Sequence, residues 1–190
     1  MAQLISKSGN FLVGTATTNL RYSIEAASIK PFETNGFSGV NNIEMDAAAA
    51  TSPNLWYCAC DKDADQYGQI TLDPADEWDA GTITVSITWS HPAASSFDCM
   101  WAVDALSVGN DDSFDQTWGT QVTSLDSGGT THDMYTTADM EVTARNATAG
   151  DVVIIRVGRL GSNGSDDLNV DAWLVSVNIE MGSTKRASTP

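Results

Sequence analysis

Short segments of alternating apolar and polar residues recur from Asp79 to Met181, and this alternation is what most constrains the fold. Residues 81–89 show it most clearly, because every second residue is large and apolar and those between are Thr or Ser. Side chains two positions apart share one face of a strand, so this pattern predicts a strand with one buried face. Its apolar positions are Ile83, Val85, Ile87 and Trp89.

The same criterion predicts further strands along the chain, joined by links rich in Gly, Asp, Asn and Ser. These links are too short for helical crossovers, so neighbouring strands should pair antiparallel. We therefore predict an all-β chain, a jelly-roll-like antiparallel β-sandwich with an extended N-terminal arm. The other predicted strands cover residues 21–25, 55–60, 65–72, 100–106, 121–125, 139–144, 151–157 and 171–181.

The alternation also predicts which side chains are buried. In residues 171–181 it places Ala172 and Leu174 on one face, with Ser176 as a third candidate, and it places Trp173, Val175, Val177 and Ile179 on the other. The residues that we expect in the core are Trp89, Trp101, Val103, Val153, Ile155 and Leu174.

Six tryptophans could line a sugar groove. Trp56, Trp89, Trp101 and Trp173 lie in predicted strands, where packing in a core or an interface is the ordinary explanation. Trp78 and Trp118 lie in turn-rich segments. We expect these two to be the exposed contacts.

The composition divides the chain into three parts. Residues 1–54 are rich in small and polar residues with scattered apolar anchors, residues 55–181 hold the predicted sandwich, and residues 182–190 read as a tail. The first part is expected to be an arm that binds a partner, although it could instead supply the first strands of the sandwich.

The net charge of −16 is concentrated in residues 55–181. An acidic surface argues against nucleic acid and against anionic membrane surfaces as partners. The three cysteines, Cys58, Cys60 and Cys99, have no disulfide spacing and suit a reducing cytoplasm. We expect neither a signal peptide nor a membrane-spanning segment.

No metal, cofactor or catalytic residue is predicted. Residues 61–65 have the Asp spacing of a calcium loop, but Gln66 and Leu72 stand where an EF-hand needs Gly and a bidentate carboxylate. His91 and His132 match no common zinc pattern with the cysteines. An isolated calcium ion bound by loop carboxylates stays open, its candidate ligands being Asp111, Asp112, Asp115, Asp166 and Asp167.

Catalysis has no sequence signature either. The Gly-x-Ser-x-Gly motif of hydrolases is absent, and carboxylates for glycoside cleavage are too numerous, at 25 acidic residues, to carry information. We therefore predict that the protein is not an enzyme. A carbohydrate-active enzyme on a jelly-roll scaffold is the third hypothesis, after the two given below.

Four segments together resemble a recurrent small β-domain of tailed-bacteriophage virion proteins, of the capsid-decoration or fibre-head type. They are residues 78–89, with a turn into a strand that ends in Trp, residues 100–115, with a strand and an acidic turn, and the two strand segments 149–159 and 166–180. The resemblance implies a jelly-roll domain in a phage particle, often trimeric, and it implies no catalytic residue.

The resemblance leads to one expected function and one alternative. We expect a capsid decoration, or cement, protein that forms a homotrimer and stabilises the phage head by binding the major capsid protein, with residues 1–54 as the clamp. Such a protein would be assembled in the host cytoplasm and located in the virion. The alternative is a tail-fibre or receptor-binding module that recognises host surface glycan.

Overall fold

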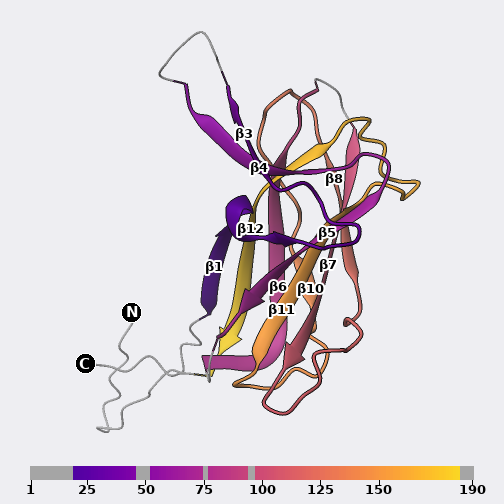
Figure 1. Ribbon diagram of the computed structural model, residues 1–190. Coiled ribbons are helices and arrows are strands. Elements are labelled where there is room, and N and C mark those ends of the chain that lie inside the picture. The colour runs from indigo at the N-terminus through magenta and orange to yellow at the C-terminus, as the bar shows by residue number, and fades with distance from the viewer. Residues whose placement is uncertain (1–18, 46–51, 75–76, 94–96, 185–190) are drawn as a thin grey trace, which may run out of the picture.

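Two antiparallel β-sheets pack face to face in the computed structural model, which describes residues 19–45, 52–74, 77–93 and 97–184 (Figure 1). The predicted fold class, an all-β jelly-roll-like sandwich, is confirmed. A 3-10 turn, η1 (Ala26–Ser28), interrupts the strands early in the chain.

One sheet has seven strands and the other has five. The order of the seven-stranded sheet is β10 (Met140–Val142), β6 (Trp78–Ser90), β12 (Ala172–Ser183), β4 (Asn54–Cys60) and β3 (Val40–Glu44). In addition, β1 (Leu20–Glu25) pairs with β12 and β9 (Tyr135–Thr136) pairs with β6. The order of the second is β2 (Lys30–Pro31), β5 (Asp65–Leu72), β11 (Val152–Leu160), β7 (Asp98–Val108) and β8 (Val122–Ser127).

The core lies between the two sheets and is built from the predicted alternation. All six side chains that we expected there are fully buried. β6 shows why, because its Ile, Val and Trp positions face the five-stranded sheet while its Thr and Ser positions face outward. This packing of β-branched and aromatic side chains is typical of a sandwich interior.

The prediction for Trp78 is wrong, and the one for Trp118 holds only in part. Trp78 opens β6 and is fully buried, because the strand begins three residues earlier than its alternation suggested. Trp118 is half-buried, stacked on Phe32 with a ring-centroid distance of 6.0 Å and contacted by the guanidinium of Arg156.

The predicted faces of β12 are also wrong beyond Leu174. The pairing of β12 with β6 shifts by one residue between Leu174 and Ser176, so Val175 is the extra residue of a β-bulge. A shift of one residue turns every later side chain to the opposite face. Val177 and Ile179 therefore join Leu174 in the core, while Trp173 lies on the outer face.

Residues 19–45 are built into the sandwich rather than set apart from it. They supply β1 to one sheet, β2 to the other and β3 to the outer edge of β4, and they place Ile29 and Phe37 in the core. The rest of the expected clamp, residues 1–18 and 46–51, lies outside the described residues. At the other end, β12 continues through Ser183, past the expected start of the tail.

Two strands share one edge of β12. β4 pairs with residues 172–174, and β1 pairs with residues 176–181. The two strands therefore meet at the bulge and diverge there, and β3 with the outer half of β4 projects beyond the sandwich (Figure 1). No helix among the described residues is long and apolar enough to cross a membrane.

Candidate ligand-binding groove

The outer face of the seven-stranded sheet carries polar side chains in ordered rows. Because strand pairing sets neighbours side by side, Arg21 of β1, Glu180 of β12 and Thr84 of β6 form one row. The next rows are Ser23, Asn178 and Ser86, and then Glu25, Ser176 and Thr88. The alternation that buries the apolar side chains of these strands thus presents their polar ones together.

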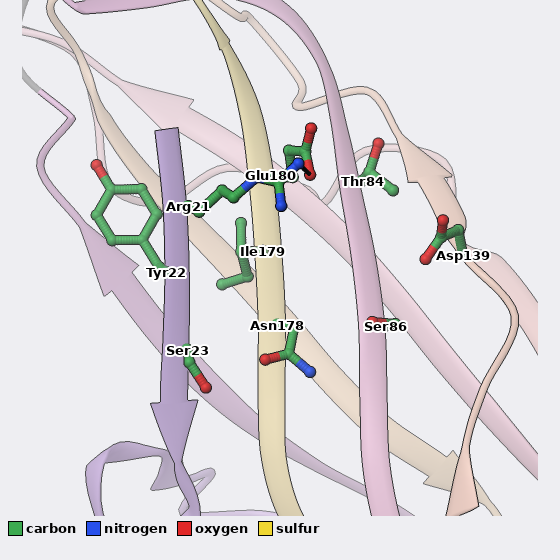
Figure 2. Close-up of a pocket in the computed structure, with 9 residues that line it drawn as sticks. All are labelled: Arg21, Tyr22, Ser23, Thr84, Ser86, Asp139, Asn178, Ile179 and Glu180. Carbon is green, nitrogen blue, oxygen red and sulfur yellow. Dashed lines mark ion pairs between the residues drawn. The ribbon is translucent and has the colours of Figure 1, made fainter. Parts of the chain in front are cut away.

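A hollow of about 380 Å³ lies over the first two rows. Figure 2 shows the side chain of Arg21 extending from β1 to Glu180 on β12, with Thr84 and Asp139 on the other side of β12. Arg21 donates to the carboxylate of Glu180 at 2.9 Å, and the amide of Asn19 donates to the same carboxylate. Among the described residues that line the hollow, this is the only salt bridge.

The other polar groups of the hollow are free to bind a ligand. Within the described part of the chain, the side chains of Ser23, Thr84, Ser86 and Asn178 have no hydrogen-bond partner, and Asp139 has no ion-pair partner. These hydroxyl, amide and carboxylate groups therefore offer donors and acceptors to an incoming molecule.

A second hollow, of about 630 Å³, opens where β1 and β4 diverge. Its walls come from Glu25 and the start of η1 on one side, Leu55 and Trp56 on the other, and Val175 and Ser176 between them. Ser23 lines both hollows, so they are neighbours beside β12, and together they are called the groove.

Trp56 is the exposed aromatic side chain of this groove, with 56% of its surface accessible. It is exposed because the outer half of β4 pairs only with β3, having separated from β12 at the bulge, where β1 takes its place. Its place in a predicted strand led us to expect Trp56 in a core or an interface, and this expectation is wrong for the described residues. The signal that could have revealed it is the polar sequence of β3, whose Asn42 is the cross-strand partner of Trp56.

An aromatic cluster continues the outer face beyond the bulge. Trp173 stacks on Tyr57 at a ring-centroid distance of 4.5 Å and on His132 at 5.4 Å, and it is only 6% exposed. The rings of Tyr57 and His132 thus cover an indole that stands on the same face as the groove.

The candidate calcium ligands have other partners or lie apart. Asp166 pairs with Arg159, Asp167 accepts the backbone N–H of Asp98, and Asp112 accepts that of Gly109. Among the described residues, no group of three or more His, Cys, Asp or Glu side chains is placed to hold a metal ion.

The fold is similar to solved carbohydrate-binding modules, while no family model and no curated protein matches the sequence. The CBM22-2 xylan-binding domain of Paenibacillus barcinonensis Xyn10C is 8% identical, with 84% of this chain and 98% of that chain covered and a TM-score of 0.48. The CBM22-1 domain of the same protein is 10% identical, with 89% of this chain and 97% of that chain covered and a TM-score of 0.42. CBM35 from Cellvibrio japonicus Abf62 is 10% identical, with 90% of this chain and 100% of that chain covered and a TM-score of 0.41.

These comparisons overturn the expected resemblance to a phage virion domain. The similar structures named above are carbohydrate-binding modules and none is a virion protein, and the predictions of a capsid decoration protein, of the major capsid protein as partner and of a homotrimer on the phage head are wrong.

Proposed function

We propose that the chain is a carbohydrate-binding domain whose ligand lies in the groove beside β12. The observation that supports this most is that exposed Trp56 lines one hollow together with Ser23 and Ser176, beside the hollow that holds the amide of Asn178. Sugars have apolar C–H faces that stack on aromatic rings and hydroxyls that need hydrogen-bonding partners. A site with one aromatic platform and several polar groups matches both needs.

The charges of the groove favour a neutral glycan. Glu25, Asp139 and Glu180 line it, and its one cation, Arg21, is already paired with Glu180. An acidic polymer would meet repulsion there, to which the net charge of −16 adds. We therefore propose a linear neutral polysaccharide, with xylan as the first candidate, and a binding role rather than a catalytic one.

Binding assays on polysaccharides test this proposal. The purified chain is incubated with insoluble xylan, cellulose, mannan and chitin and with a uronic acid polymer, and the bound fraction is measured. We expect at least one neutral polymer to retain the protein. Trp56→Ala and Asn178→Ala should each weaken binding at least tenfold, because they remove a stacking surface and a hydrogen-bonding group.

A matched control comes from the other parts of the surface. Phe114 is 67% exposed and lies outside the groove, so Phe114→Ala removes a comparable apolar surface and should leave binding unchanged. The proposal is overturned when no neutral polymer binds, or when the Trp56 and Phe114 variants bind as well as each other.

A further inference from the structure

His91 anchors a segment that covers the aromatic cluster. The segment, residues 128–134, is called the cover segment below. The imidazole of His91 is fully buried, and its Nε2 accepts the backbone N–H of Gly129 at 3.3 Å. The backbone carbonyl of His91 accepts the N–H of His132 at 3.0 Å. Two hydrogen bonds to one residue therefore hold the cover segment in place.

The rest of the cover segment completes the closed arrangement. The hydroxyl of Tyr135 donates to the carbonyl of Thr130 at 3.0 Å, and its ring stacks on His91 at 5.4 Å. His132 has a left-handed backbone with a φ of 64°, and its ring lies on Trp173. The backbone conformation at His132 is uncommon for a non-glycine residue, so the surrounding contacts must maintain it.

The hydrogen bond to Gly129 requires a neutral His91. Because Nε2 accepts that bond, the ring proton is on Nδ1, and a second proton would turn Nε2 into a donor facing another donor. Burial, the largest cause, lowers the pKa of His91; the backbone of Ala93 and the charge of Asp133 raise it, and the charge of His132 lowers it.

The remaining ionisable groups around His91 come from β9 and β8. Tyr135 on β9 stacks on the ring, and Asp126 on β8 is engaged by the indole Nε1 of Trp89 at 2.7 Å. Asp133 is therefore the carboxylate whose charge acts on His91. It is exposed, so water screens its charge.

We propose that protonation of His91 releases the cover segment and exposes Trp173 as a second stacking platform for the ligand. Trp173 lies on the outer face of β12, the face that presents Ser176 and Asn178 to the groove. When His132 leaves, one face of the indole becomes free in line with those groups. The ligand-binding step rests on the proposed function, whereas the opening step does not.

The direction of the pH effect follows from proton linkage. In the open state His91 should titrate near 6.5, and in the closed state its pKa is lower. The open state therefore binds more protons, so closure is complete above neutral pH and weakens as the pH falls below 6.5. The ratio of closed to open molecules should fall by up to about tenfold per pH unit until the closed-state pKa is reached.

Nuclear magnetic resonance on the histidine rings and backbone amides tests the opening between pH 8 and pH 4.5. The signals of His91, of the Gly129 amide and of the Trp173 indole should change with one common midpoint below 6.5. His91→Gln keeps an acceptor for Gly129 without titrating, so it should lose this response. His132→Phe keeps the ring stacking and should retain it.

Two outcomes overturn the opening. One is an acid response that survives in His91→Gln and disappears in His132→Phe, which would assign the titration to His132. The other is a His91 ring signal that moves in the wild-type chain while the Gly129 amide does not. The wild-type measurement decides the second case even if the His91 variant does not fold.

Glycan affinity tests the ligand step separately. Affinity for the polymer that binds at neutral pH should rise several-fold at pH 5, Trp173→Ala should abolish the rise, and His132→Ala should produce it at pH 8. If magnetic resonance detects the opening but no glycan binds at any pH, the proposed function is wrong and the opening step still holds. Glycan binding that stays constant while the segment opens overturns the role of Trp173.

Discussion

Arg159 and Asp166 form a bidentate ion pair in which neither side chain is exposed to solvent. Nε of Arg159 lies 2.9 Å from Oδ2 of Asp166, and Nη2 lies 2.7 Å from Oδ1. The same guanidinium donates to the carbonyls of Cys60, Leu168 and Val170. One side chain of the five-stranded sheet thus fastens the last loop and the end of β4.

Asp166→Ala should destabilise the fold strongly, because it leaves the guanidinium of Arg159 buried without its counter-charge. Breaking one side of a buried pair typically costs about 3–5 kcal/mol, and urea unfolding measures this loss. The control is Asp63→Asn, which breaks the exposed pair with Lys62 and should cost less than about 1 kcal/mol. Equal losses in the two variants would contradict the burial of the Arg159 pair.

Two tryptophan variants should separate core from surface. Trp101→Ala removes a fully buried ring and should lower the free energy of unfolding by about 3–5 kcal/mol. Trp56→Ala removes an exposed one and should stay within about 0.5 kcal/mol of the wild type. Denaturant unfolding gives both values, and a large loss for Trp56→Ala would show that this ring is packed.

Gly68→Ala should destabilise the sandwich at the contact with Phe37. A Cβ at residue 68 would lie 2.0 Å from the ring carbon Cζ of Phe37, which is buried. Relieving this overlap requires the ring to move, and such overpacking costs about 1–3 kcal/mol. Gly39→Ala is the matched control, because no atom lies within 4 Å of its added Cβ. Thermal unfolding should show a lower midpoint for the first variant and little change for the second.

The three cysteine thiols should be unreactive in the folded chain. Burial raises the pKa of Cys58 to about 11 and also raises the pKa values of Cys60 and Cys99. Thiolate, the reactive form, is therefore scarce at pH 8. A colorimetric thiol reagent should label none of them rapidly without denaturant and all of them in urea. Rapid labelling of one thiol under native conditions would show that its site opens locally.

Local patterns predicted the fold but not the site. Alternation of apolar residues determines a strand and its buried face, and β6 formed as its sequence indicates. Strand pairing is a long-range property, however, and the groove exists because β1 and β4 share one edge of β12. No local pattern in residues 20–25 or 54–60 specifies that they would meet there.

Single residues account for the remaining errors. The extra residue of the β-bulge, Val175, turns every later side chain of β12 to the face opposite the predicted one. The order of apolar and polar residues in this strand does not show where the bulge lies. Trp56 and Trp78 exchanged their expected roles, because Trp56 lies where β4 has separated from β12, whereas Trp78 lies in β6 and pairs with the end of β12.

The pairing of β1 with β12 also determines how the domain responds to mechanical load. Leu20 is the partner of Met181, and the register then runs inwards to Glu25 and Ser176. A force that pulls residues 20 and 181 apart acts on this terminal pair alone, so the backbone hydrogen bonds break one after another from the end, as in a zipper. The first strand to detach would be β1, which forms one wall of the groove, and bound ligand would be released before the core of the sandwich is disturbed.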